Sequence, residues 1–411
     1  MRKGAGQGGR LLFSWGGGDT VAAYGTKDRG NGAGKGGRTR GQGREDGGKG
    51  REDGGKGREN GAGKGGRTRG KGWRAAAEVG SVKCKQLCAF ILLYFGRNMY
   101  ICSEMKYGVI GTGAIGGYYG SLLSKAGKEV HFLFHSDYEY VRQNGLFVKS
   151  CDGSFHLDSI NAYKASADMP QCDVVLVCLK TVNNHRLASL LTPLLHPRTV
   201  VVLIQNGIGV EQDVQAMFPQ TSLVAGLAFI CCSKTEPGHV NHQCYGSINL
   251  ANYSCPDATL VRAVVRDFVE AGIDAHEVEY HEARWKKAVW NMPFNGMTVA
   301  LNTRTDLLLG HPSTRQLIRE QMMEVIQAAQ HLGVKNIDES FADKMIATTD
   351  AMTPYSPSMK LDFDHCRPME IHYLYTRPIE IAAVNGFPMP KLSMLEAELR
   401  FIEYHRLHQE E

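Results

Sequence analysis

The chain has no apolar run long enough to cross a membrane and no paired cysteine motif. A membrane-spanning helix needs roughly 18–20 consecutive apolar residues, and the longest candidate, "LCAFILLYF" at residues 87–95, is far shorter. The 11 cysteines are scattered through apolar contexts such as "VVLVCLK", which predicts neither a zinc site nor a disulfide framework. We therefore expect buried thiols, no metal site, no membrane contact and a cytoplasmic location.

Acidic and large apolar residues are scarce in residues 1–104. This segment holds 21 of the 47 Lys and Arg residues and 29 of the 48 glycines, but only 9 of the 42 Asp and Glu residues. It also repeats itself, since "NGAGKGGRTRGQG" at residues 31–43 returns as "NGAGKGGRTRGKG" at residues 60–72. Such a composition cannot bury enough apolar surface to offset chain entropy, so we predict a disordered leader over residues 1–104.

Two interpretations of this leader are open. Its Arg and Lys side chains could neutralise phosphates of a nucleic acid, although the repeat lacks aromatic side chains that would stack on bases. The interpretation we favour is a solvated tail, or translated sequence upstream of the true start, with Met99 and Met105 preceding the first structured element. Residues 105–411 hold 26 Lys and Arg against 33 Asp and Glu, so we expect no nucleic acid on the folded part.

A dinucleotide-binding pattern begins directly after the leader. "KYGVIGTGAIGGYYGSLLSKAGKEVHFLF" reads as a strand, a glycine turn, an amphipathic helix and a second strand. The turn has the spacing G-x-G-x-x-G, which allows a tight bend, close approach to a pyrophosphate and close packing of helix on strand. We assign the turn residues Gly111, Gly113, Ala114, Ile115 and Gly116 to cofactor binding.

The residues after the second strand leave the choice of dinucleotide open. An acidic side chain there suits a free ribose 2′-OH, and a basic side chain suits a 2′-phosphate. The sequence places His135, Ser136 and Asp137 at this point. His135 could contact a phosphate and Asp137 could contact a ribose, so both NADPH and NADH fit the chemistry.

Two further apolar runs predict strands that are buried on both faces. "CDVVLVCLKT" ends in Lys180, and "TVVVLIQNGIG" ends in Gln205, Asn206 and Gly207. Open α/β sheets bind ligands beyond the carboxyl ends of their strands, so Lys180 and Asn206 are candidates for cofactor or substrate contact. The alternatives are an exposed loop lysine and an ordinary Asn-Gly turn.

A polar stripe follows one face of a predicted helix in "RWKKAVWNMPFNGMTVALN", residues 284–302. Lys287, Asn291 and Asn295 lie at i, i+4 and i+8 and share that face, whereas Lys286 does not. The alternatives are a surface lysine and asparagines that cap or pair helices. Pro293 removes a backbone donor inside the pattern, so we expect a bend that alters the alignment of the two asparagines.

From about residue 106 to the C-terminus, the chain resembles the ketopantoate reductase (2-dehydropantoate 2-reductase) family. The resemblance rests on "GTGAIGG", "LKT", "IQNG", "RWKKAVWNMPFN", "PSMKLDFDHCRPMEI" and "NGFPMP", in that order. It implies a Rossmann-type α/β domain, for which we expect residues 105–277, and an all-helical substrate and catalytic domain over residues 278–411. It also implies NADPH-dependent reduction of ketopantoate to pantoate in the synthesis of pantothenate and coenzyme A.

The resemblance also assigns roles to residues. It implies catalytic roles for Lys287 and Glu370 and a cofactor contact for Lys180, while the cofactor contact assigned to His135 rests on its own chemistry. It implies substrate contacts for Asn291, Asn295, Ser358 and Asn206, the last also touching the cofactor. The family commonly has an arginine near the position of His135 to hold the 2′-phosphate, so the preference for NADPH over NADH is left open here.

The chemistry of ketone reduction fits these residues. Flanking tryptophans would shield Lys287 from water and lower its pKa towards that of a general acid, and Glu370 could bond its ammonium or a substrate hydroxyl. The alternative functions are a related reductase of another branched 2-oxo acid and a dinucleotide-binding protein without turnover. The sequence leaves the oligomeric state open, including a homodimer.

Overall fold

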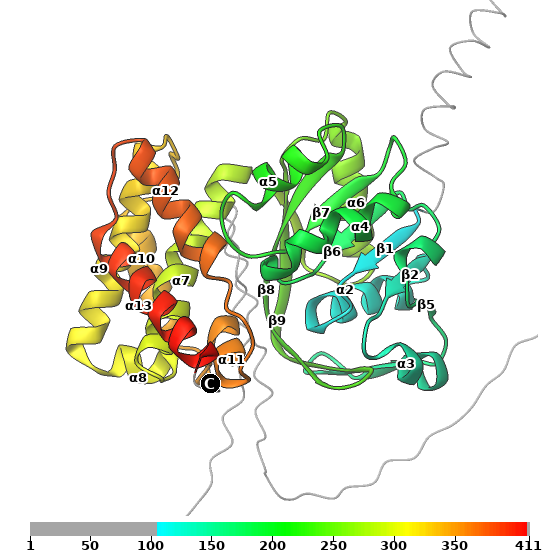
Figure 1. Ribbon diagram of the computed structural model, residues 1–411, viewed down its shortest axis with the longest axis horizontal. Helices are drawn as coiled ribbons and strands as arrows, with labels where there is room; N and C mark the ends of the chain where they lie inside the picture. The colour runs from blue at the N-terminus through cyan, green and yellow to red at the C-terminus, as the bar shows by residue number, and fades with distance from the viewer. Residues whose placement is uncertain (1–104, 409–411) are drawn as a thin grey trace, which may run out of the picture. The chain divides into compact units, whose positions relative to one another are not determined.

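The computed structural model describes residues 105–408. The predictions made for residues 1–104 lie outside the described residues. The described part contains a large sheet flanked by helices, followed by a region made of helices (Figure 1). This arrangement confirms the predicted fold class, an α/β domain followed by helices. Within residues 105–408, no helix has the length and apolar character needed to cross a membrane.

The sheet has ten strands in the described part of the chain. Nine follow the order β4-β3-β9-β8-β7-β6-β1-β2-β5, and β10 pairs with β9. All pairs are parallel except β3 with β4 and β8 with β9. The strands are β1 (Tyr107–Ile110), β2 (Val130–Leu133), β3 (Leu146–Ser150), β4 (Phe155–Leu157), β5 (Asn161–Tyr163), β6 (Val174–Val177), β7 (Val200–Leu203), β8 (Ser222–Glu236), β9 (His239–Asn252) and β10 (Ala275–Val278).

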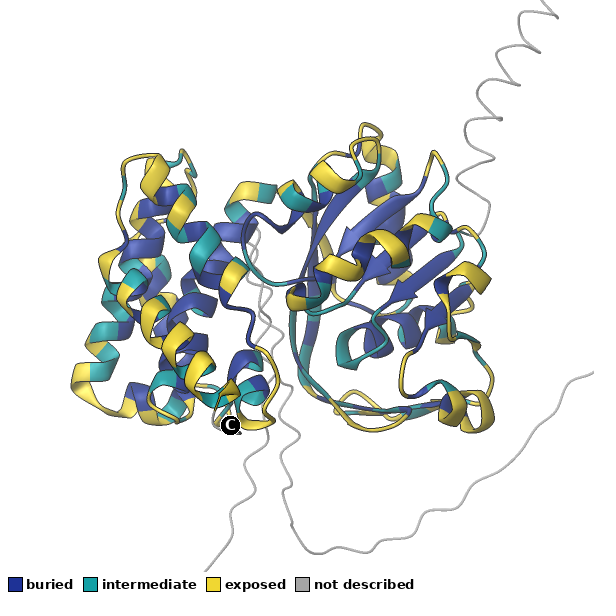
Figure 2. Ribbon diagram, viewed as in Figure 1, coloured by how far each residue is buried: buried dark blue, intermediate teal, exposed yellow. Residues whose placement is uncertain are grey.

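The central strands are buried on both faces, as their unbroken apolar runs predict (Figure 2). Side chains alternate between the faces, so Val109 joins the core under α2 and α6, while Ile110 joins the core under α4 and α5. The helices and 3₁₀ turns are α2 (Ala114–Lys125), α3 (Tyr138–Asn144), η1 (Ser166–Asp168), η2 (Thr181–Arg186), α4 (Leu187–Leu191), η3 (Thr192–Leu194), α5 (Val210–Met217) and α6 (Ala258–Glu270).

The helical region is built around α7, which packs against α9, α11 and α13. Glu279 caps α7 by accepting hydrogen bonds from the backbone N–H groups of His281 and Glu282. The exact division of the chain after residue 277 stays a prediction. The elements are α7 (Tyr280–Ala300), α8 (Thr305–Gly310), α9 (Pro312–His331), α10 (Glu339–Asp350), α11 (Ser358–Asp364), the π-helical turn η4 (His372–Thr376), α12 (Arg377–Val384) and α13 (Pro390–Leu407).

Strands β8 and β9 are much longer than the other strands. β8 pairs with β7 only through its first residues, from Ser222 to Ala225. Beyond that point it continues with β9 as an antiparallel ribbon that extends past the carboxyl end of β7 (Figure 1). We call residues 226–247 of this ribbon the β8–β9 arm. The arm contacts both the start of α2, through Cys232, and the helical region, through Ala228.

Candidate active site

The glycine turn has the geometry that its spacing predicts. Gly111 has φ +88°, and a Cβ there would lie 2.7 Å from the backbone N of Leu179. A Cβ on Gly116 would lie 2.5 Å from the carbonyl oxygen of Gly111, so helix α2 packs closely on β1. A Cβ on Gly113 would meet nothing within 4 Å, because this residue faces a cavity.

The start of helix α2 is an anion-binding cradle. Its N-cap residue Gly113 has no side chain to offer, and its first turn contains no acidic residue. The first N–H groups of a helix lack intrahelical partners and carry the positive end of the helix dipole. The backbone around Ala114 and Ile115 lines the cavity, so these donors suit the pyrophosphate of a dinucleotide.

The cavity has a volume of about 1000 Å³ and lies between the carboxyl ends of the strands, the β8–β9 arm and the helical region. It brings together most of the residues that the sequence singled out. Gly111, Gly116 and the exposed His135 are not among its lining residues. The predicted residues that do line it are Gly113, Ala114, Ile115, Lys180, Asn206, Lys287, Asn291, Asn295, Ser358 and Glu370.

Lys287 is a buried charged group in the wall of this cavity. Its ammonium donates to the carbonyl oxygen of Ala228 at 2.8 Å and lies 5.2 Å from the ring centre of Phe229. Burial, with a smaller contribution from the nearby Arg284 guanidinium, lowers the pKa of Lys287 to about 7. The neighbouring Lys286 instead pairs with Glu282 at 2.5 Å.

The two asparagines of the stripe share the face of Lys287. Helix α7 runs through Pro293 without interruption, and both Asn291 and Asn295 line the cavity. Both asparagines therefore line the same cavity as Lys287, and the bend expected at Pro293 stays a prediction. Asn295 also accepts a hydrogen bond from the backbone N of Met359 at 3.1 Å, which holds the start of α11 and with it Ser358.

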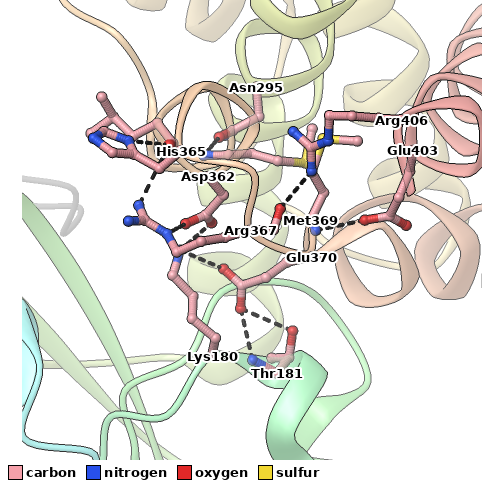
Figure 3. Close-up of polar contacts among 12 residues, drawn as sticks. Lys180, Thr181, Asn295, Asp362, His365, Arg367, Met369, Glu370, Glu403 and Arg406 are labelled. Atoms are coloured by element: carbon pink, nitrogen blue, oxygen red, sulfur yellow. Dashed lines mark hydrogen bonds and ion pairs between the residues drawn. The ribbon is translucent and has the colours of Figure 1, made fainter. Parts of the chain in front are cut away.

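Glu370 binds a different lysine from the one expected. Its carboxylate accepts hydrogen bonds from the N–H and hydroxyl of Thr181, both at 2.9 Å, and from the Lys180 ammonium at 3.1 Å (Figure 3). Lys180 also bonds Asp362 at 2.8 Å. Glu370 acts on Lys287 only through its field, which raises the lysine's pKa against the larger effect of burial. These contacts of Lys180 and Thr181 with Asp362 and Glu370 therefore link the loop after β6 to the helical region.

Asp137 does not have the role that its position suggested. Its carboxylate is buried and accepts hydrogen bonds from Lys234, from the backbone N of Gly238 and from Ser136. The expected ribose contact is therefore occupied by protein donors. Lys234 arrives from β8, which the sequence analysis did not identify as part of the site.

Sequence reasoning missed the β8–β9 arm and the loop before α11. The arm contributes Ala228, Phe229 and Lys234 to the cavity, and the loop contributes Tyr355. A signal for the arm was present, since the apolar run "LVAGLAFICC" precedes a Pro-Gly turn and another strand-like run. Nothing in that pattern indicates that the hairpin would reach the glycine turn.

One cluster of metal-ligand side chains lies outside the cavity. Ligand atoms of Cys151, Asp152 and His242 lie within 4.8 Å of one another. Both ring nitrogens of His242 are already within hydrogen-bond distance of protein oxygens, one on Ser150 and one on Tyr245. The cluster therefore presents no free imidazole nitrogen to an ion.

Known proteins resemble this chain along its folded part. Residues 107–254 match the family model "Ketopantoate reductase PanE/ApbA", and residues 279–403 match "Ketopantoate reductase PanE/ApbA C terminal". A 2-dehydropantoate 2-reductase of Nostoc sp. is 43% identical over 307 residues, covering 73% of this chain and 96% of the relative.

Solved structures of 2-dehydropantoate 2-reductases also resemble this chain. A 2-dehydropantoate 2-reductase from Geobacter metallireducens is 36% identical with a TM-score of 0.70, covering 72% of this chain and 99% of its own. A second, from Methylococcus capsulatus, is 33% identical with a TM-score of 0.67, covering 74% and 98%.

Proposed function

This chain belongs to the ketopantoate reductase family of oxidoreductases, and we propose that it reduces 2-dehydropantoate to pantoate with NADPH. This reaction would supply pantoate for pantothenate and coenzyme A synthesis. The observation that carries the proposal is the position of Lys287. A buried lysine with a pKa of about 7 faces the same cavity as the uncapped start of α2.

The residues around the glycine turn fit a nicotinamide dinucleotide. Gly111 and Gly116 shape the turn, and the backbone of Gly113, Ala114 and Ile115 would hold the pyrophosphate. The bound dinucleotide would supply a hydride to the ketone carbon.

Two polar residues at the carboxyl ends of strands would guide the cofactor towards the substrate. Lys180 after β6 and Asn206 after β7 line the cavity between the glycine turn and α7. Both positions lie where open α/β sheets place ligand contacts. Lys180 is held in place by Asp362 and Glu370.

Lys287 is proposed as the general acid. A ketone gains negative charge on oxygen as the hydride arrives, and a nearby ammonium stabilises that charge and then donates its proton. An acid with a pKa near the working pH does this well. The Ala228 carbonyl holds the ammonium in place until substrate arrives.

The other polar side chains would orient the substrate. Asn291 and Ser358 offer hydrogen bonds for a hydroxyl and a carboxylate. Asn295 fixes the start of α11, which carries Ser358. Glu370 is proposed as a positioning residue that keeps Lys180 charged and in place.

The test compares two acids that differ by one group. The full-length chain with NADPH should turn over ketopantoate, while 2-oxoisovalerate, which lacks the hydroxymethyl group, should react at least about 100-fold less well in kcat/KM. Oxidation of NADPH is followed by absorbance. Faster turnover of another branched 2-oxo acid would replace the proposed substrate, and binding of NADPH without turnover of any acid would contradict an enzymatic role.

Two lysine variants test the assignment of the acid. Lys287→Ala should lower kcat by several orders of magnitude, whereas Lys286→Ala should change it little, because Lys286 pairs with Glu282. Equal losses in the two variants would overturn the choice of Lys287.

A further inference from the structure

The β8–β9 arm runs beside the cavity from one end of the expected cofactor site to the other. At Ala228 it accepts the hydrogen bond of Lys287, and at Cys232 its thiol lies 3.6 Å from the carbonyl oxygen of Ala114, at the start of α2. At Lys234 it reaches Asp137, which follows β2. The last of these contacts lies where a Rossmann fold receives the adenosine ribose.

The carboxylate of Asp137 has no capacity left for a ribose hydroxyl. One oxygen accepts from Lys234 at 2.8 Å and from Ser136 at 2.9 Å, and the other accepts from Lys234 at 3.0 Å and from the N–H of Gly238 at 3.2 Å. A carboxylate has about four lone-pair sites, and these four contacts use them. Asp137 is therefore an acidic residue at the position that would favour a free 2′-OH, but its carboxylate is already fully hydrogen-bonded to the protein.

The ammonium of Lys234, in contrast, can bind a second anion in addition to the Asp137 carboxylate. Its side chain is 37% exposed and lines the cavity, and its ammonium has three donors, two of which bond the oxygens of Asp137. The hydrogen bonds to Asp137 also outweigh the effect of burial and lower the pKa of that carboxyl, so the pair is ionic. It places a cation beside the end of β2, close in sequence to the exposed His135.

We propose that Lys234 binds the 2′-phosphate of a phosphorylated dinucleotide and, by closing Asp137, makes this chain select NADPH over NADH. This inference rests on the proposed function for the presence of a nicotinamide dinucleotide. It adds a specificity-determining residue from the arm, about 100 residues away in sequence from the usual position. The merely structural alternative is that Lys234 ties the arm to α3.

Measuring the binding of dinucleotides in the absence of substrate distinguishes a 2′-phosphate contact of Lys234 from a purely structural role. NADPH and NADH are titrated into the full-length protein by calorimetry, with adenosine 2′,5′-bisphosphate and 5′-AMP as shorter probes of the same end. Lys234→Met should weaken NADPH and the bisphosphate on the order of tenfold, as expected for loss of one charge-assisted phosphate contact. NADH and 5′-AMP should not bind more weakly, because Asp137 regains the two hydrogen-bonding positions that Lys234 occupied, and Lys234→Arg should restore the difference.

Controls distinguish a local effect from a general one. Lys164→Met removes an exposed lysine that pairs with Glu139 on α3 and should alter neither dinucleotide. Asp137→Asn leaves the ammonium of Lys234 without its counter-charge and should raise the preference for NADPH. This variant also answers the question if Lys234→Met fails to fold.

Each remaining outcome overturns a stated claim. Equal weakening of NADPH and NADH by Lys234→Met, with no gain in Asp137→Asn, would leave Lys234 a structural tie. Wild-type protein that binds neither dinucleotide would contradict the proposed function itself. Wild-type protein that binds both equally would overturn the specificity inference while the reductase proposal stands.

Discussion

Replacing Lys287 by methionine should stabilise the folded protein in acid and neutral solution. The fold lowers the pKa of Lys287 from 10.5 to about 7, and one pKa unit corresponds to about 1.4 kcal/mol. The buried ammonium therefore costs about 5 kcal/mol below pH 7. Loss of the hydrogen bond to Ala228 offsets about 1 kcal/mol of the gain. The net stabilisation by Lys287→Met should be about 4 kcal/mol.

The sign of the pH dependence follows from proton binding. Between pH 7 and 10.5 the unfolded chain keeps a proton on Lys287 that the folded chain has released, so wild-type stability rises with pH through this window. The advantage of Lys287→Met should therefore be greatest below pH 7 and should vanish near pH 10, where the remaining gain equals the roughly 1 kcal/mol lost with the hydrogen bond to Ala228. Other titrating groups affect both proteins and cancel in the difference.

Urea unfolding followed by tryptophan fluorescence at pH 6, 7, 8.5 and 10 measures this difference. The matched control is Lys286→Met, which removes an ammonium paired with Glu282 and should give no stabilisation that grows in acid. A Lys287→Met variant that is destabilised at pH 6, or whose advantage does not depend on pH, would refute the claim that burial dominates at this position.

Three further predictions concern activity and cofactor binding. The kcat/KM of wild-type reduction should fall about tenfold per pH unit above pH 7, as Lys287 loses its proton; a flat profile would exclude it as the acid. Glu370→Gln removes a charge that raises the pKa of Lys287, so the pH profile of kcat/KM for this variant should begin to fall at a lower pH than that of the wild type. Gly116→Ala, whose Cβ would meet a carbonyl oxygen at 2.5 Å, should lower Tm and NADPH affinity together. Gly113→Ala, with open space around it, should lower NADPH affinity and leave Tm unchanged.

Local pattern was enough to predict the elements that carry the site. The glycine spacing predicts the β1-turn-α2 unit because each glycine has a separate steric reason, and the crowding at Gly111 and Gly116 confirms it. Helical periodicity predicts the shared face of Lys287, Asn291 and Asn295, since that face depends only on residue spacing.

The contacts between distant segments could not be predicted in this way. Glu370 and Thr181 lie 189 residues apart, and Lys234 and Asp137 lie 97 residues apart. Their pairing depends on how β8 leaves the sheet and how the loop before η4 meets the loop after β6. No local pattern encodes either path, and so the partner of Glu370 and the closure of Asp137 were both missed.

The β8–β9 arm sets the distance between the contact with Lys287 and the contact with Asp137. The segment from Ala228 to Lys234 spans about 20 Å at roughly 3.3 Å per residue, and its two ends touch Lys287 and Asp137. One inserted residue would lengthen this span and also turn the side chains beyond it to the opposite face. Variation in length should therefore be excluded between Ala228 and Lys234, although this segment contains no residue of the glycine motif.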